Sequence, residues 1–307
     1  MKARFNLFKK SREEPSALPH QEATEWNDKG LALAKSGQYT EALAAFEQAL
    51  EIDPHNETVW YHKGITLARL GQSAKALAAY EQLLDINPQQ AKAWEGKGLA
   101  LARLRRPADA LAAFERALEI DPQNTEGWYN KGVVLNELGR ATDALAAFER
   151  VLEIDARHAR AWNNKGAALN RAGRTADALA AFERALEIDP QHIGAWHNKG
   201  LALSKLDKTA EAIVAFDRVL DINPRIADAW TDKGNALNRL GRTAEALTAY
   251  EQALDINPKA AGTWFNKGVA LANSGRVGEA LPCLEQALQL GFPPAADAIA
   301  QCRQMLH

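Results

Sequence analysis

Histidines, carboxylates and one Gly-Lys-Gly stretch are the residues of this chain that could do chemistry. Gly96 to Gly98 lies inside a predicted helix, so it does not form a phosphate-binding loop. Carboxylates recur at fixed intervals, which is typical of a solvated helix face: Glu47, Glu81, Glu115, Glu149, Glu183, Asp217, Glu251 and Glu285. The histidines show no HExxH motif or i, i+4 pair for zinc: His20, His55, His62, His158, His192, His197 and His307. Because catalysis needs converging groups, we expect no enzyme activity, no metal site and no cofactor.

Composition and charge narrow the class of protein further. The formal net charge of -2 at pH 7 gives no reason to expect nucleic acid or a membrane as partner of the whole molecule. A repeated base-reading pair, which an RNA-binding array needs, is also absent. Cys283 and Cys302 lack metal-ligand spacing and suit a reducing compartment. The N-terminus has no signal-peptide core, and no segment reaches about 18 apolar residues, so we expect a cytoplasmic protein.

A strict repeat organises the chain. Each tryptophan lies 34 residues from the next, and a Lys-Gly pair begins three residues after each one. The tryptophans are Trp26, Trp60, Trp94, Trp128, Trp162, Trp196, Trp230 and Trp264. A fixed period of this length predicts one array of stacked units instead of two globular domains.

The elements that position these residues are two amphipathic helices per unit. Counted from three residues before each tryptophan, tryptophan holds position 4, glycine 8, leucine 11, alanine 20, a ring or leucine 24, and leucine 28, which are helical intervals. Glycine at position 15 predicts a left-handed turn between the helices, with Arg105 and Asp207 as exceptions. We expect Thr175 to cap its second helix.

Glycine inside a helix needs a reason, because it costs on the order of 1 kcal/mol relative to alanine. The position-8 glycine predicts that the first helix closely approaches the ring at position 24, as with Gly166 and Phe182. Trp162 is expected to bury its ring in the same seam.

The pattern W-x2-x-G-x2-L, then A-x3-F/Y-x2-A and proline, resembles the tetratricopeptide repeat over residues 23–294. The resemblance implies an all-α solenoid of helix-turn-helix units in an open right-handed superhelix with a concave groove. We expect a basic, flexible leader at 1–22, eight repeats that start at 23, 57, 91, 125, 159, 193, 227 and 261, and a solvating helix at 295–307. The family's clamp for chaperone C-termini is absent, because only Asn130 and Arg160 match it, while Glu95, Leu99 and Asn164 do not.

The resemblance also implies a non-catalytic scaffold for protein–protein interaction. Positions 2, 5, 6, 9, 12 and 13 share one side of the first helix and vary between repeats, so we expect them to bind an extended peptide or protein segment. A slight excess of cations favours a partner with acidic or C-terminal carboxylate groups. The expected site residues are Tyr61, Arg69, Arg103, Tyr129, Asn130, Val133, Asn136, Arg160, Asn164, Asn170, Arg171, His197, Asn198, Leu201, Asn235, Asn238, Arg239, Phe265 and Asn266.

Two features leave alternatives open. Lysine at position 7 forms either a cationic ladder or, as we favour, structural pairs with acids at the ends of the preceding second helices: Glu51, Asp85, Glu119, Glu153, Glu187, Asp221 and Asp255. The leader, with Phe5, Leu7 and Phe8 among basic residues, could touch an anionic membrane, occupy the groove of the same or another molecule, or remain a loose tail. The alternative function is a structural protein that self-assembles through its ends or this leader.

Overall fold

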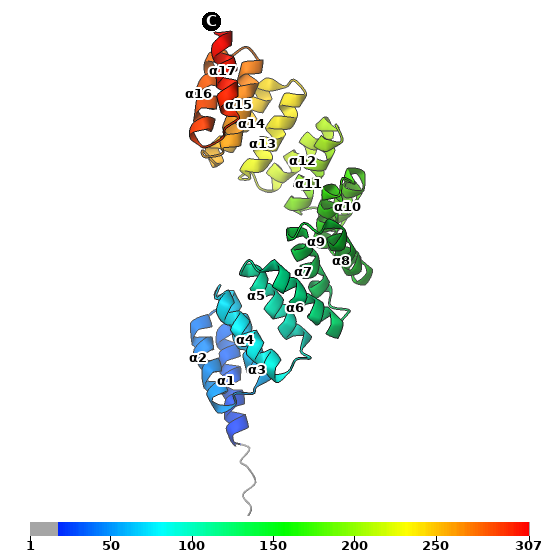
Figure 1. Ribbon diagram of the computed structural model, residues 1–307, viewed down its shortest axis with the longest axis vertical. Helices are drawn as coiled ribbons and strands as arrows, with labels where there is room; N and C mark the ends of the chain where they lie inside the picture. Colours follow the sequence, from blue (N-terminus) through cyan, green and yellow to red (C-terminus); the bar gives the residue numbers. More distant parts are fainter. Residues whose placement is uncertain (1–17, 307) are drawn as a thin grey trace, which may run out of the picture. The chain divides into compact units, whose positions relative to one another are not determined.

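The computed structural model describes residues 18–306, and this part of the chain folds into seventeen α-helices without a strand (Figure 1). Two compact units are described separately: Met1–Leu138, which contains α1 to α7, and Gly139–His307, which contains α8 to α17. Within the described part, no helix is long and apolar enough to cross a membrane. The expected all-α class is confirmed.

The helices alternate between first and second members of a pair. The first helices are α1 (Leu18–Lys35), α3 (Glu57–Arg69), α5 (Ala91–Arg103), α7 (Thr125–Glu137), α9 (Ala159–Arg171), α11 (Ile193–Lys205), α13 (Ala227–Arg239) and α15 (Ala261–Asn273). The second helices are α2 (Tyr39–Ile52), α4 (Ser73–Ile86), α6 (Pro107–Ile120), α8 (Ala141–Ile154), α10 (Thr175–Ile188), α12 (Thr209–Ile222), α14 (Thr243–Ile256) and α16 (Val277–Gln289), and α17 (Ala295–Met305) follows them. From α3 onward the first helices begin where repeats were expected to start, whereas α1 begins earlier, at Leu18.

Contacts between helices define two layers in each unit. Within each unit, every helix packs on the next one along the chain, and successive first helices also touch, as in α1 with α3 and α11 with α13. Within either unit, no described second helix contacts another second helix. In each unit the first helices therefore form a continuous surface, called the first-helix face of that unit below, and the second helices lie on the opposite side.

The close approach predicted for the position-8 glycine is confirmed. A Cβ atom on Gly166 would lie 2.5 Å from Cε1 of Phe182, and one on Gly98 would lie 2.7 Å from Cε1 of Phe114. The rings themselves are fully buried. Glycine therefore lets the backbone of the first helix rest directly on the ring of the second.

The turns between paired helices follow the prediction, and the helix cap does not. Gly173 adopts a φ of 78°, and Arg105 and Asp207 adopt the same left-handed conformation at φ values of 59° and 58°. Thr175 is the first residue of α10 and not its cap: Arg174 precedes the helix without a capping hydrogen bond, and the Thr175 hydroxyl donates to Asn170 Oδ1 at 3.2 Å. Because the turn between α9 and α10 is short, Thr175 is already the first residue of α10.

The tryptophans lie further out than expected. Trp162 packs against Phe182 and Ala181 but remains only partly buried. Its indole Nε1–H donates to the carbonyl of Ala156 at 3.0 Å, and Trp196 donates in the same way to Pro190 at 2.9 Å. The indole N–H of each tryptophan needs a hydrogen-bond acceptor, so each ring stays near the surface. The bond links the first helix to the turn that precedes it.

The last helix covers the end of the second unit. Ala295, Ile299 and Cys302 of α17 are buried, and Ile299 and Cys302 belong to the same apolar cluster as Leu284 of α16. Its remaining face carries mostly polar residues. This arrangement is consistent with the expected solvating helix. Cys283 and Cys302 are both free and buried.

Candidate functional site

The structure places every expected site residue on a first helix, but in two separately described units. The first unit holds Tyr61, Arg69, Arg103, Tyr129, Asn130, Val133 and Asn136. The second unit holds Arg160, Asn164, Asn170, Arg171, His197, Asn198, Leu201, Asn235, Asn238, Arg239, Phe265 and Asn266. Each unit therefore carries its own part of the first-helix face.

A tyrosine pair marks the first unit. The ring of Tyr61 lies 6.4 Å from that of Tyr80 and 6.0 Å from that of His62. Burial, and secondarily the charge of Glu95, raises the pKa of Tyr61, and burial raises the pKa of Tyr80 strongly. A Cβ on Gly96 would lie 2.5 Å from Cζ of Tyr80, so Tyr80 reaches from α4 under two first helices. Both phenols stay neutral at physiological pH.

Sequence reasoning did not select Tyr80, because position 24 reads as a core position. The tyrosine hydroxyl could have indicated that this position is more than core packing. Most repeats carry phenylalanine at position 24, whereas Tyr80 and Tyr250 carry a polar group there. Tyr250 uses its hydroxyl to donate to Asn235 Oδ1 at 2.9 Å. For Tyr80 no hydrogen bond is recorded within the described part of the chain.

The cations at position 13 act between repeats. Arg103 Nη1 donates to the carbonyl of Ala68 at 2.8 Å, in the last turn of the preceding first helix. In the same way, Arg239 donates to the carbonyl of Ser204 at 3.0 Å and pairs with Asp207 at 2.8 Å. These bonds satisfy carbonyls that a helix end leaves unpaired.

Leu99 and two amides complete the part of the face in the first unit. Leu99 at position 9 of α5 is 39% exposed. On α7, Nδ2 of Asn130 and Oδ1 of Asn136 are buried and have no hydrogen-bond partner within the described part. Buried polar atoms without partners are rare enough to need an explanation.

The amides of the second unit form links between repeats. Asn198 donates to Asn163 Oδ1 and Asn266 donates to Asn235 Oδ1, each at 2.9 Å. His197 Nε2 lies 2.8 Å from Asp232 Oδ2. Several amides that we expected to await a ligand therefore already join neighbouring first helices.

Other expected site residues of the second unit are also engaged. Lys205 donates to Asn170 Oδ1 at 3.2 Å, and Asn238 accepts from Thr243 at 3.5 Å. The ring of Phe265 lies 4.9 Å from that of Phe292, which follows α16. Leu201 is partly buried against the apolar cluster of this unit, while Arg171 is exposed at the end of α9.

The lysines at position 7 face the second helices and are structural. Lys165 Nζ lies 3.0 Å from Glu149 Oε1 and 5.3 Å from the centroid of the Trp162 ring. The acids we had expected as partners were wrong, because the contacts involve acids one turn earlier. The pairs are Lys63–Glu47, Lys97–Glu81, Lys131–Glu115, Lys165–Glu149, Lys199–Glu183, Lys233–Asp217 and Lys267–Glu251.

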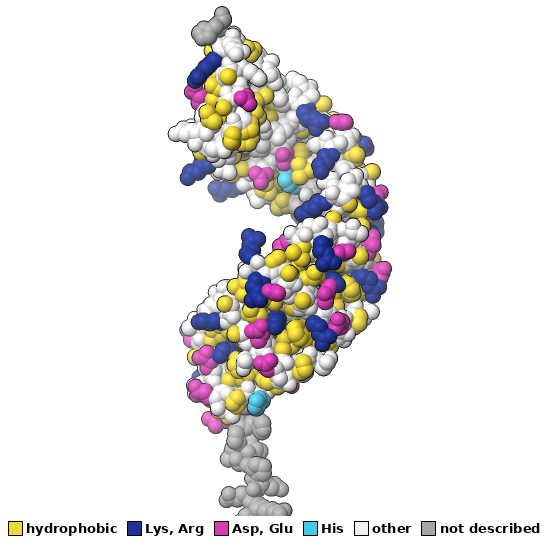
Figure 2. Space-filling model, viewed as in Figure 1, with side chains coloured by type: hydrophobic (Ala, Val, Ile, Leu, Met, Phe, Trp, Pro, Cys, Tyr) yellow, Lys and Arg dark blue, Asp and Glu magenta, His cyan; other side chains and the backbone are white. Residues whose placement is uncertain are grey.

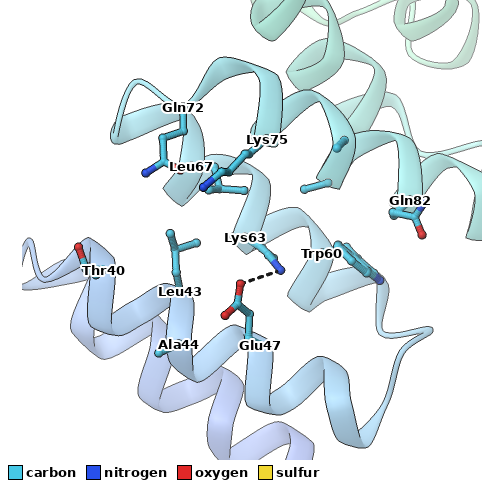
Figure 3. A pocket seen from close by; sticks show the side chains of 12 residues that line it. Thr40, Leu43, Ala44, Glu47, Trp60, Lys63, Leu67, Gln72, Lys75 and Gln82 are labelled. Carbon is cyan, nitrogen blue, oxygen red and sulfur yellow. Dashed lines mark ion pairs between the residues drawn. The ribbon is translucent and has the colours of Figure 1, made fainter.

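Cavities open between the second helices, a side that the sequence did not single out. One of about 680 Å³ lies between α2 and α4, with Trp60, Lys63 and Leu67 of α3 as its floor (Figure 3). Another of about 630 Å³ lies over α1 and α2. On the visible side of each unit, both signs of charge are interspersed with hydrophobic side chains (Figure 2).

The described residues show no group of three or more His, Cys, Asp or Glu side chains that could hold a metal ion. The first-helix face offers amides for hydrogen bonds, together with half-buried tyrosines and an exposed leucine for apolar contacts.

Comparisons with known proteins agree with this architecture. Two models described as tetratricopeptide repeat match the chain, one at residues 27–91, 61–125, 97–158, 129–193 and 197–261 and the other at 237–302. No curated protein sequence matches the chain.

Solved structures also resemble the fold. YrrB, described as a TPR protein with an unusual peptide-binding site, is 27% identical, with a TM-score of 0.51 over 59% of this chain and 93% of YrrB. MamA is 23% identical, with a TM-score of 0.53 over 56% of this chain and 94% of MamA. A tetratricopeptide repeat protein from Parabacteroides merdae is 16% identical, with a TM-score of 0.64 over 82% of this chain and 99% of that one.

Proposed function

The chain belongs to the tetratricopeptide repeat family and is a protein-interaction scaffold, and we propose that its first-helix face binds an extended peptide or protein segment of a partner. The observation that carries this proposal is Leu99, which stays 39% exposed on the continuous surface formed by successive first helices. Tyr61 and Arg103 on the same face are of the residue types that are enriched at the centres of interfaces.

The first unit supplies the chemistry for such a ligand. Leu99 and Tyr61 offer apolar contact to such a ligand. Asn130 Nδ2 and Asn136 Oδ1 supply an unused donor and acceptor, which a small side-chain movement would bring to a peptide backbone. YrrB, which shares the fold, is described as having a peptide-binding site.

A partner with an acidic side chain or C-terminal carboxylate is part of the proposal. Arg103 uses one guanidinium N–H for Ala68, and the other N–H groups of this fork remain to bind a carboxylate. The free, buried cysteines suit a reducing compartment, so we place this function in the cytoplasm.

The test is a selection from a random peptide-display library on the full-length protein. Peptides that are enriched by the parent protein and by Lys75→Ala, but not by a Tyr61→Ala, Leu99→Lys variant, would support the proposal. Lys75 lies on α4 and lines the cavity between second helices, so its variant controls for binding on that side. If the Tyr61, Leu99 variant enriches the same peptides, binding lies elsewhere. If no peptide is enriched, the self-assembly alternative becomes the better account, and sedimentation at increasing concentration would show it.

A further inference from the structure

Acidic residues near the start of the second helices are paired with a cation in most repeats. From α6 onward, the acid in the first turn forms an ion pair with a basic residue three positions earlier: Arg106–Asp109, Arg140–Asp143, Arg174–Asp177, Lys208–Glu211, Arg242–Glu245 and Arg276–Glu279. In α2 the equivalent acid is Glu41, but Gln38 replaces the cation. The described part of the chain gives Glu41 no ion pair.

The last turn of α2 also lacks a cation, as do those of α4 and α14, where Gln82 and Gln252 precede Asp85 and Asp255. The acid of α2, Glu51, corresponds to acids that pair with an arginine three residues earlier: Arg116–Glu119, Arg150–Glu153, Arg184–Glu187 and Arg218–Asp221. In α2 the arginine is replaced by Gln48, whose Nε2 donates to Glu51 at 3.0 Å without neutralising its charge. Glu41 therefore lacks the cation that its counterparts have, and Glu51 lacks the cation that four of its six counterparts have.

Both carboxylates line the cavity of about 630 Å³ over α1 and α2, here called the first-repeat groove. Trp26 and Leu33 of α1 and Ala44 and Ala45 of α2 give it an apolar lining. In the next cavity along the chain, the preceding second helix supplies one wall, as α2 does beside Trp60 in Figure 3. Among the described residues, no helix precedes α1 to supply that wall to the first-repeat groove.

The sequence before α1 contains basic and apolar residues, which could pair with the acids of this groove and cover its apolar lining. Residues 1–17 contain five basic side chains, at Lys2, Arg4, Lys9, Lys10 and Arg12, against two acidic ones, together with Phe5, Leu7 and Phe8. Residues 23–56 contain six acidic side chains against two basic ones. A chain of this length, at about 3.3 Å per residue, can readily span the roughly 12 Å along α1 between Leu18 and Trp26.

One interval points to specific side chains. In all seven lysine–acid pairs at position 7, the acid stands sixteen residues before the lysine, as Glu47 does before Lys63. Lys29 lies 4.4 Å from the Trp26 ring centroid, in the groove lining, and the residue sixteen positions before it is Glu13. Glu13 therefore stands at the same sequence interval from Lys29 as the seven acids do from their lysines.

We propose that residues 1–17 dock on the first-repeat groove of their own chain. Glu13 pairs with Lys29, the basic side chains supply cations to Glu41 and Glu51, and Phe5 and Phe8 cover the apolar lining. This inference is independent of the function proposed for the first-helix face. It gives the N-terminal end of the array a cover, as α17 covers the other end.

Limited trypsin digestion of the full-length protein tests this docking. The rate of cleavage after Lys9, Lys10 and Arg12 is measured by mass spectrometry, relative to the rate in a synthetic peptide of residues 1–17. The proposal predicts cleavage about tenfold or more slower in the protein, because a docked segment is cut only when it opens. Glu41→Gln with Glu51→Gln should bring the two rates within about twofold of each other.

The matched control is Asp109→Asn with Glu119→Gln, which changes the net charge equally at the corresponding positions of α6 and should leave the protection intact. Phe5→Ala with Phe8→Ala, compared with a peptide of the same sequence, should remove it. Equal rates in the parent protein and peptide would overturn the proposal, as would protection that survives the Glu41, Glu51 substitutions. Protection that rises with protein concentration would overturn docking on the same chain and assign it to a second copy.

Discussion

A carbon atom attached to the Cα of Gly166 would lie 2.5 Å from Cε1 of Phe182, far inside van der Waals contact. Phe182 has no exposed surface and therefore little room to move away. Gly166→Ala should destabilise the protein by roughly 1–3 kcal/mol, the usual cost of overpacking, although alanine is the better helix former.

The control for this substitution is Gly262→Ala in the first turn of α15, where an added Cβ meets nothing within 4 Å. That change should stabilise by about 0.4–1 kcal/mol through the unfolded state. Urea unfolding followed by circular dichroism measures both, and equal effects from the two substitutions would contradict the packing explanation.

Much of this architecture was predictable from the sequence because packing repeats with the period. The position-8 glycine, the ring or leucine at position 24 and the turn at position 15 each serve the same geometric need in every repeat. The partners of Lys63 and its equivalents were mispredicted because helix periodicity leaves two acids one turn apart as candidates, and only the coordinates distinguish them. The amide links, such as Asn198 to Asn163, depend on contacts between repeats that no single helix reveals.

Arg105 should be a strained residue that glycine can relieve. Its φ of 59° lies in the left-handed region, where six equivalent positions carry glycine. Arg105→Gly is expected to raise the free energy of unfolding by about 0.5–1 kcal/mol. Asp207→Gly relieves a similar φ of 58° but removes the ion pair with Arg239, so it should gain less. Thermal melts would contradict this account if Arg105→Gly lowered the midpoint.

The tryptophan and the lysine of one repeat should contribute very differently to stability. Trp162→Ala removes a large packed ring and an indole hydrogen bond, and should cost roughly 3–5 kcal/mol. Lys165→Met removes an ion pair with a half-exposed Glu149 and a cation–π contact, and should cost about 1 kcal/mol or less. A lysine effect as large as that of the tryptophan, measured by urea unfolding, would show that the ladder of lysines does more than we assign to it.

Stability should fall as the pH drops below about 6.5, and His62 should account for part of the fall. Burial lowers the pKa of His62 below its ordinary value, so the unfolded chain binds more protons than the folded one in this range. Because stability rises with pH wherever the unfolded state binds more protons, protonation favours unfolding. The loss begins near pH 6.5 and continues down to the folded pKa.

His62→Gln should flatten this dependence, whereas His55→Gln, at an exposed position, should not. Urea midpoints between pH 5 and 8 for the parent and both variants give the comparison. A slope unchanged by His62→Gln would assign the pH dependence to other groups.

The most direct test of recognition by the first-helix face is the dissociation constant of a display-selected peptide, measured by fluorescence anisotropy on the parent protein, Leu99→Lys and Lys75→Ala. The account predicts that Leu99→Lys weakens binding at least tenfold, about 1.4 kcal/mol, while Lys75→Ala stays within about twofold of the parent. Binding that is unaffected by Leu99→Lys but weakened by Lys75→Ala would contradict it and would place the ligand between the second helices.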